Sequence, residues 1–386
     1  MRNETLGRLA ILGLLSAATV LAQGVPLPVG SVKFSLPQDA PVALQSLSTD
    51  ESRASARGAA MVLDLHLAAP LRNISNKRIC GITLRVVSQD VTLGGQASVS
   101  MPSLNVGPGE VVPVRIDRPL IRPTQIAGGA LVEVILDGVL FQDLSFWGPD
   151  RLNSRRTMTA WEMEAQRDRD YFKRILAANG RAGLQKAMIE SLSRQASVQQ
   201  LDVRLLRAPA VTSAAASSVS GQAERTEKFA FLEFPDSPVQ ATDGYALVSG
   251  NEARAPRIVV RNRSAKPVKH VELGWLVRDP GGQEYLAASL PSSQPDLYLL
   301  AGKTAKVEQD TALRFSRNGK PLNIQSMTGF VSEVEFADGK VWVPARQSLD
   351  QELLHKVLPP SAEEQRLTDL YRRKGPDALI EELRKY

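Results

Sequence analysis

Hydrophobic and polar residues alternate in a stretch of the chain that occurs twice. Residues 71–90 align without a gap with residues 260–279. In the first copy Ile82, Leu84 and Val86 lie on one side of the pattern, with polar side chains between them. This period of two predicts a strand with one buried and one solvated face, as in antiparallel sheets. Six residues are identical between the copies: Arg72, Asn73, Ser75, Lys77, Leu84 and Asp90 recur as Arg261, Asn262, Ser264, Lys266, Leu273 and Asp279.

The second copy repeats the alternation with larger side chains. Val271, Leu273 and Trp275 take the hydrophobic positions, and Glu272 lies between them at the position of Thr83. We therefore expect the hydrophobic side chains of each copy, Trp275 included, to lie in the core. Thr83 and Glu272 are expected to face water.

Each copy opens with an Asn-x-Ser-x-Lys sequence, at Asn73 and at Asn262. Asn and Ser side chains bond to nearby backbone groups and so favour turns over regular structure. The same residues form an N-glycosylation sequon, which matters only in a host that glycosylates the chain. A turn before the strand is the preferred interpretation, with glycosylation as the alternative.

Further short hydrophobic runs with glycine turns surround both copies. In the first repeat we expect strands at residues 61–67, 91–101, 111–116 and 131–146, and a polar loop at 49–60. A turn at Asp137-Gly138 is expected to interrupt the last strand, with Asp338-Gly339 as its counterpart in the second repeat. Short strands at this spacing indicate a β-sandwich.

From residue 157 onward the hydrophobic period becomes helical. Thr159 and Glu162 predict a capping box, and Gly180 is expected to break the helix before a second one follows. The C-terminal part repeats this arrangement, with a capping box at residues 361–364 and a break at Gly375-Pro376. Each repeat is therefore expected to end in a helical hairpin.

The predicted fold is α+β, with two tandem antiparallel β-sandwich units of Ig-like type, each followed by a short helical hairpin. The expected parts are a signal peptide at residues 1–22, sandwich one at 31–150, hairpin one at 155–200, a linker at 201–227, sandwich two at 228–348 and hairpin two at 349–386. Small polar residues from Ala208 to Glu224 predict a flexible linker, so each unit is expected to fold independently.

The order of these motifs resembles that of exported FxLYD-type and related immunoglobulin-like modules. The resemblance rests on the Asn-x-Ser-x-Lys turn with its strand, on the turn Pro280-Gly281-Gly282, and on the late glycine turns Pro108-Gly109-Glu110 and Ala301-Gly302-Lys303. It covers about half of each repeat, the Leu-Tyr-Asp signature is absent, and each unit runs on past such a module. The resemblance implies an Ig-like sandwich outside the cytoplasm and supplies no catalytic residues.

The N-terminus has the pattern of a secretory signal. Arg2 and Arg8 precede an apolar run at residues 9–21, and cleavage is expected after Ala22, which makes Gln23 the first mature residue. The run is shorter than the roughly 20 apolar residues of a transmembrane helix. No membrane-spanning segment is expected after cleavage.

Charge and cysteine content narrow the classes of partner. The chain carries 47 Lys and Arg against 41 Asp and Glu, a net charge of +6. Removal of Arg2, Glu4 and Arg8 with the signal lowers this to +5, since 6 − 1 = 5. The two signs are mixed and aromatic residues make up only 5%, which argues against nucleic acid as a partner. A lone cysteine, Cys80, allows no intrachain disulfide.

The residue types that usually carry chemistry form no motif in this sequence. No histidine has another ligand residue at metal-site spacing; the three are His66, His270 and His355. The acid pairs Glu162/Glu164 and Glu363/Glu364 are expected in first helical turns, where acids interact favourably with the helix dipole. We therefore assign no catalytic, metal-binding or cofactor-binding residue, and no cofactor.

The tryptophans are the remaining candidates for a ligand surface. Trp161 is expected on the apolar face of the first helix, and Trp147 and Trp342 end strands near the junction of sheet and helices. At that junction they either pack under the hairpin or lie on a surface that binds sugars or peptides.

The expected function is that of an exported, non-catalytic binding or scaffold protein of the cell envelope or the extracellular space. Its location would be periplasmic or extracellular, and its expected partner is another envelope or extracellular protein. The two copies share turn and core residues but no polar cluster, whereas a duplicated enzyme would be expected to repeat its acids or histidines. The alternatives are an exported hydrolase whose active site follows no motif, and a carbohydrate-binding module.

Overall fold

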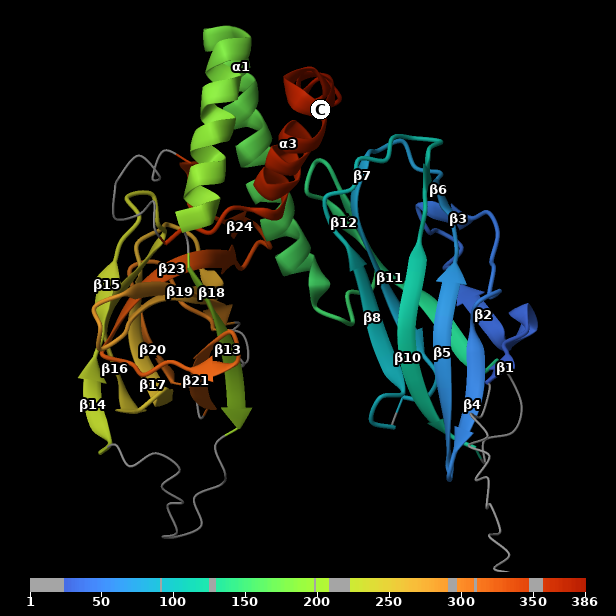
Figure 1. Ribbon diagram of the computed structural model, residues 1–386, viewed down its shortest axis with the longest axis horizontal. Helices are drawn as coiled ribbons and strands as arrows, with labels where there is room; N and C mark the ends of the chain where they lie inside the picture. Colours follow the sequence, from blue (N-terminus) through green and yellow to red (C-terminus); the bar gives the residue numbers. More distant parts are fainter. Residues whose placement is uncertain are drawn as a thin grey trace, which may run out of the picture. The chain divides into compact units, whose positions relative to one another are not determined.

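The computed structural model describes residues 24–90, 92–124, 130–197, 199–207, 223–290, 297–308, 311–346 and 357–386 (Figure 1). These residues form an α+β fold rich in sheet, in which the helices α1 and α3 accompany many short strands. Contacts between Cα atoms divide the chain into two compact units. Unit 1 comprises residues 1–75, 84–99 and 109–136, and unit 2 comprises residues 76–83, 100–108 and 137–386.

Unit 1 contains a four-stranded antiparallel sheet with the order β1-β4-β5-β10. Its strands are β1 (Val25–Pro26), β4 (Arg53–Arg57), β5 (Ala60–Ala68) and β10 (Arg115–Pro123). Leu63, Leu65 and Leu67 of β5 are buried, which confirms the alternation predicted for this strand. A short 3-10 turn, η1 (Val29–Ser31), lies near the start, and a three-stranded sheet consists of β3 (Val42–Leu44), β6 (Leu71–Asn73) and β9 (Val111–Val112).

The sequence predicted a loop throughout the polar run at residues 49–60, and this prediction is wrong for part of the run. β4 lies within it and pairs with β5 as a hairpin, from Arg53 opposite Asp64 to Arg57 opposite Ala60. None of its side chains is fully buried, and most are Arg, Ser or Ala. The strand is held by backbone pairing, which leaves no hydrophobic alternation to detect.

The duplicated stretch forms β7 (Ile79–Val87) in the first copy and β18 (Val268–Arg278) in the second. The hydrophobic side chains of β7 are buried as expected, Leu84 among them. Thr83 is fully buried too, so the prediction that it faces water is wrong. The helix α1 (Ser154–Ser197) covers that face, and Thr83 Oγ1 lies 2.8 Å from Met158 Sδ.

β7 belongs to a five-stranded sheet with the order β12-β11-β7-β8, in which β2 also pairs with β11. The other strands are β2 (Val32–Ser35), β8 (Gln96–Met101), β11 (Val132–Phe141) and β12 (Phe146–Trp147). Asp137-Gly138 lies inside β11, so the turn predicted there is wrong. A Cβ atom on Gly138 would lie 2.2 Å from the Phe146 ring, so this glycine permits close packing instead.

The turn that matches Asp338 in the second copy lies at Asp143. Lys77 Nζ lies 2.7 Å from Asp143 Oδ2, and Lys266 Nζ lies 2.6 Å from Asp338 Oδ2. The two lysines occupy identical positions in the duplicated stretch. The ion pair therefore identifies the equivalent residue where sequence spacing did not.

The Asn-x-Ser turns have the same hydrogen bonds in both copies. Asn73 Oδ1 accepts from Ser75 N at 3.0 Å and Ser75 Oγ at 2.7 Å. Asn262 Oδ1 accepts from Ser264 N at 2.9 Å and Ser264 Oγ at 2.7 Å. The carbonyl oxygens of the two asparagines accept from the late glycine turns, at Gly109 N and Gly302 N. Both asparagines are fully buried, so the turn interpretation is confirmed.

Unit 2 contains a mixed sheet of twelve strands, whose main path has the order β14-β16-β17-β21-β13-β19-β18-β23-β15. The strands besides β18 are β13 (Gln200–Arg207), β14 (Arg225–Lys228), β15 (Ala230–Leu232), β16 (Val239–Ser249), β17 (Glu252–Asn262), β19 (Glu284–Leu290), β20 (Thr304–Glu308), β21 (Thr311–Arg317), β22 (Lys320–Pro321), β23 (Ser326–Phe336) and β24 (Val341–Trp342). β14 and β15 are the first and last strands of this order, and they are consecutive in the chain, since β14 ends at Lys228 and β15 begins at Ala230. The two edges of the sheet therefore lie close together. The sheet is nearly closed and barrel-like, and tandem Ig-like sandwiches are not confirmed.

Residues 201–207, which the sequence analysis included in the linker, belong to β13. This strand pairs antiparallel with β21, from Asp202 opposite Ser316 to Arg207 opposite Thr311. The core of the sheet contains Trp275, as predicted, with its ring centroid 4.7 Å from that of Phe229.

Helix α1 begins earlier than its predicted capping box. Asp150 Oδ1 accepts from Ser154 N at 2.7 Å and from Arg155 N at 3.1 Å, and these bonds satisfy the free amides of the first turn. Thr159 therefore lies inside the helix, and the box at Thr159 is wrong. The second box is confirmed, because Ser361 caps α3 (Ala362–Leu383) and accepts from Glu364 N at 3.0 Å.

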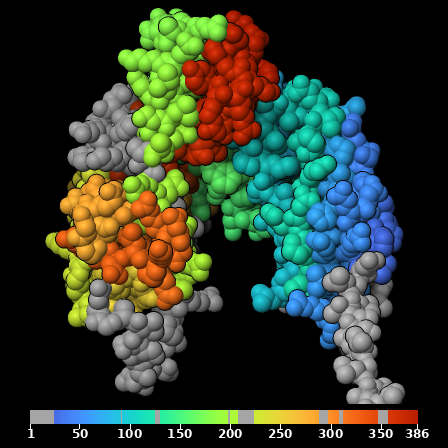
Figure 2. Space-filling view, in the orientation of Figure 1, coloured from blue at the N-terminus to red at the C-terminus, as the bar shows by residue number. Residues whose placement is uncertain are grey.

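The two helices bend where the sequence predicted breaks and pack on each other. Gly180 has φ 61° in α1 and Gly375 has φ 80° in α3, values that favour glycine. Four α1 side chains and three α3 side chains form one buried core: Phe172, Leu184, Ala187, Met188, Leu367, Leu379 and Leu383. Figure 2 displays the helices in direct contact. The hairpins of both repeats thus share a core.

Some predictions fall outside the described residues. These are the cleavage site after Ala22, His355, and the linker at residues 208–222. No helix among the described residues has an apolar stretch long enough to cross a membrane.

Candidate functional site

His66 and the thiol Cys80 lie on different strands, β5 and β7. His66 Nδ1 lies 2.8 Å from Asp117 Oδ1 on the surface, and this hydrogen bond raises the pKa of His66. Cys80 is buried, and burial followed by the charge of Glu162 raises its pKa to about 12, so it is an unreactive thiol. Among the described residues, no group of His, Cys, Asp and Glu could hold a metal ion.

Most of the paired acids lie in a buried ionic network between the helices. Arg346 Nη1 lies 2.8 Å from Asp168 Oδ1 and 3.2 Å from Glu364 Oε2, and Arg194 pairs with the same Glu364. Ser361 Oγ donates to Asp168 Oδ2 at 2.6 Å. Burial alone would raise the pKa of Asp168, but the arginines lower it below its usual value. These charges compensate one another, so the network joins the helices structurally.

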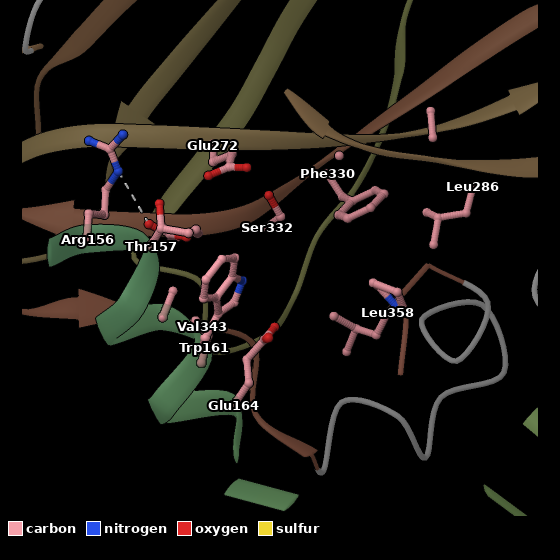
Figure 3. A pocket seen from close by; sticks show the side chains of 15 residues that line it. Arg156, Thr157, Trp161, Glu164, Glu272, Leu286, Phe330, Ser332, Val343 and Leu358 are labelled. Atoms are coloured by element: carbon pink, nitrogen blue, oxygen red, sulfur yellow. Dashed lines mark ion pairs between the residues drawn. The ribbon is translucent and has the colours of Figure 1, made fainter. Parts of the chain in front are cut away.

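A cavity of about 400 Å³ lies between the first turns of α1 and the strands β18 and β23 (Figure 3). From the helix, Thr157, Ala160, Trp161 and Glu164 line it. Their spacing of i, i+3, i+4 and i+7 places these four side chains on one helix face. The helix therefore presents one aromatic ring and one carboxylate to the sheet.

A β-bulge shapes the opposite wall. Glu272 is opposite Glu333, and Leu273 is opposite Val331, so Ser332 has no partner position in β18. Ser332 and Glu333 both line the cavity. Two ionised carboxylates directly opposite each other destabilise a strand pair, so this arrangement is unfavourable whenever Glu272 and Glu333 are both ionised.

Burial and mutual repulsion keep protons on two of the carboxyl groups. Burial, then the charge of Glu272, raises the pKa of Glu333 to about 8, although Arg156 acts in the opposite direction. Burial raises the pKa of Glu164 to about 7, against the effect of Arg167 and with a further contribution from Glu272. Carboxyl groups with such pKa values exchange their protons near neutral pH.

Arg156 compensates Glu333 only in part. Arg156 is the basic residue among the described side chains that line the cavity. Its Nε lies 3.7 Å from Glu333 Oε1, beyond hydrogen-bond distance, while its Nη1 donates to Glu335 Oε2 at 3.4 Å. Glu333 Oε1 and Ser332 Oγ are buried without a hydrogen-bond partner among the described residues. The cavity thus contains polar atoms without hydrogen-bond partners, and both become acceptors for a ligand once Glu333 loses its proton.

The other end of the cavity is apolar. Phe330, Leu286 and Leu358 line it and belong to a buried cluster, and Trp161 keeps 39% of its surface exposed. Figure 3 shows Trp161 and Glu164 on the helix, facing Glu272 and Ser332 on the strands. The cavity can therefore contact an apolar group at one end and hydrogen-bond donors at the other.

This site could be predicted from the sequence only in part. Trp161 was predicted to lie on the core face of the helix, Glu164 in a first helical turn and Glu272 in water. The structure instead places all three side chains along the cavity. Trp161 and Glu164 are three residues apart, so helical spacing could have predicted that these two side chains share one helix face. Nothing in the sequence says that α1 lies against β18. For Trp342, two alternatives were open, packing in the protein or a place on a ligand surface. The structure supports packing, because Trp342 contacts two neighbouring apolar clusters and its Nε1 donates to Asp236 Oδ2 at 3.0 Å.

Comparisons with known proteins find only weak likenesses. No known family and no curated protein matches the chain. Among solved structures, an ApaA protein from Bordetella pertussis is 10% identical, with 39% of this chain and 98% of that chain covered and a TM-score of 0.18. A structure named pT26-6p is 10% identical, with 89% and 72% covered and a TM-score of 0.18. Red sea bream transglutaminase is 7% identical, with 80% and 32% covered and a TM-score of 0.13. Likenesses this weak carry no argument about fold or function.

Proposed function

We propose that this chain is an exported, non-catalytic binding protein of the cell envelope or extracellular space, and that the cavity between α1 and the β18–β23 pair is its binding site. The observation that carries the proposal is the Glu272–Glu333 pair, which is unfavourable for the sheet and lines a cavity. Residues that impair folding yet surround a cavity are typical of binding sites.

Part of this proposal is that the two repeats descend from an exported Ig-like module of FxLYD type. The matched hydrogen bonds at Asn73 and Asn262, and the matched ion pairs at Lys77 and Lys266, support a common origin of the repeats. They are turn contacts and contain no repeated chemistry. A binding role, with another envelope or extracellular protein as partner, accounts for a duplicated scaffold in which α1 and the β18–β23 pair enclose a cavity.

The test is a ligand screen with a variant that fills the cavity. Thr157 is exposed at its edge, so Thr157→Trp should occupy the space without disturbing the core. We expect ligand-observed NMR to detect fragments that bind the natural chain and no longer bind Thr157→Trp. The control is Thr226→Trp, which adds the same ring to the exposed strand β14. Fragments that bind all three proteins equally would contradict the proposed site.

A second candidate is the exported hydrolase. The observation that favours it is the pair of raised pKa values, about 7 for Glu164 and about 8 for Glu333, because a general acid must hold a proton near neutral pH. If the chain hydrolyses glycosides, Glu164→Gln and Glu333→Gln should each abolish turnover of an aryl glycoside panel. Residual turnover in both variants would exclude these carboxyl groups as the acid.

A further inference from the structure

We infer that the cavity accepts an organic cation, an ammonium or amidinium group carried on an apolar stem. This inference rests on the proposed function of the cavity as a binding site, and it names the class of ligand.

The balance of charge in the cavity favours a cation. Glu164, Glu272 and Glu333 line it, and each acts electrostatically on another of the three. Among the described residues of the lining, Arg156 is the basic one, and it is shared between Glu333 and Glu335. A bound positive charge would replace the protons that two of these carboxyl groups retain. An anion would add to the repulsion instead.

The buried acceptors favour a ligand with N–H donors. Ser332 Oγ and Glu333 Oε1 are buried and have no hydrogen-bond partner among the described residues. Such atoms cost free energy unless a donor reaches them. An ammonium group supplies three donors and no acceptor, and an amidinium group supplies donors in a plane. Both satisfy the acceptors without introducing an acceptor of their own.

The aromatic and apolar side chains favour a ligand with a hydrophobic stem. Trp161 presents its ring from the helix, and a tryptophan face attracts a cation within about 6 Å. Phe330, Leu286 and Leu358 lie at the other end, where a ring or alkyl chain replaces water. A bare metal ion would leave these apolar side chains unused. The described residues also contain no group of ligands that suits such an ion.

The chain itself supplies a reporter for the experiment. Trp161 can be observed by fluorine NMR in protein labelled with fluorotryptophan, and Trp161→Phe assigns its signal among those of the four tryptophans. The probes are benzylammonium, benzamidinium and benzyl alcohol, which share a ring and differ in charge. We expect the two cations to shift the Trp161 signal at concentrations roughly tenfold lower than benzyl alcohol.

Variants separate charge from shape. Glu333→Gln keeps the size of the side chain and should weaken binding of the cations roughly tenfold while leaving benzyl alcohol unchanged. The matched control is Glu284→Gln, which removes a half-buried acid of the same sheet that pairs with Arg278 outside the cavity. Affinity for benzylammonium should also rise roughly tenfold or more from pH 6 to pH 8.5, as Glu164 and Glu333 lose their protons beside Arg156, Arg167, Asp168, Glu272 and Glu335.

The outcomes distinguish the two levels of the proposal. Binding of benzyl alcohol as tightly as the cations, lost in Thr157→Trp, would overturn the cation inference and leave the binding site in place. Equal loss of all three probes in Glu333→Gln would also overturn it, because the carboxylate would then act through shape alone. No shift of the Trp161 signal with any probe would overturn both the inference and the proposed site.

Discussion

At the scale of the residue, the surroundings of a polar side chain depend on what covers its face of the strand. Thr83 and Glu272 occupy equivalent positions in the duplicated stretch and alternate with core residues. Alternation alone cannot tell whether the other face meets water or a helix, because both accept polar side chains. The structure places Thr83 under Met158 and Glu272 in the cavity beneath α1. Glu272 is thus part of a site where the sequence predicted a solvated face.

The pKa of Glu333 predicts a dependence of stability on pH. Its folded value of about 8 lies above the ordinary value of 4.5, so the folded state binds more protons between these pH values. The free energy of unfolding should therefore fall as pH rises from about 5 to 8. Glu333→Gln removes this loss, so it should equal the natural chain near pH 5 and exceed it at pH 8 by on the order of 2 kcal/mol.

Urea unfolding at the two pH values measures this difference. Glu284→Gln, on an exposed pair, should change the free energy of unfolding equally little at both. The opposite result is a stability difference between Glu333→Gln and the natural chain that turns against the variant as pH rises from 5 to 8. It would show that the fold stabilises the ionised carboxylate.

The buried position of Thr83 predicts a cost for its truncation. Leu84→Ala removes fully buried methyl groups and should cost about 2–5 kcal/mol. Thr83→Ala removes a buried hydroxyl and methyl group packed on Met158 and should cost about 1–2 kcal/mol. Calorimetry of both variants provides the measurement. A change within about 0.5 kcal/mol for Thr83→Ala would mean that α1 does not cover this face.

At the scale of the element, local signals predicted both helix breaks and one of the two helix caps. Gly180, Gly375 and the cap at Ser361 follow from residue types whose backbone preferences act locally. The cap of α1 was missed because Asp150, the residue that accepts its first amides, precedes the predicted box by nine positions (159 − 150 = 9). β4 and β13 were missed because long-range pairing, and not their own pattern, makes them strands.

The cap of α1 can be tested by comparing two substitutions of Asp150. Asp150→Ala removes the acceptor for Ser154 N and Arg155 N and should cost about 1–2 kcal/mol. Asp150→Asn keeps a side-chain oxygen and tolerates the residue's φ of 51°, so it should cost less. Hydrogen exchange of the first amides of α1 should accelerate in the alanine variant alone. Equal exchange in both variants would place the cap elsewhere.

At the scale of the whole molecule, the shared helical core changes the expected independence of the repeats. Helix α1 follows the first repeat and α3 ends the second, and their apolar side chains are buried together. The sequence shows that both hairpins have apolar faces, but it cannot show which face covers which. The expectation that cutting starts in the linker from Ala208 to Glu224 stays a prediction.

Cleavage in that linker should leave a complex and not two free halves. β13 and α1 precede the cut, and β21 and α3 follow it, yet they pair and pack with each other. The nicked protein should elute from a sizing column as the intact chain does. Phe172→Ala should cost about 3–5 kcal/mol and release the fragments, whereas Ile189→Ala, at an exposed position of the same helix, should not. Separate fragments from the natural chain would contradict the shared core.

The paired helical core also has a consequence for ancestry. Phe172, Leu184 and Met188 lie in α1 at the same spacing as Leu367, Leu379 and Leu383 in α3, and the kinks at Gly180 and Gly375 lie at matching places. Equivalent positions that meet one another are the mark of a twofold interface between identical chains. We expect that a single-repeat ancestor associated with itself through this hairpin, and that gene fusion made the pair permanent. A descendant that lost one repeat would have to find a new partner for the hairpin that remained.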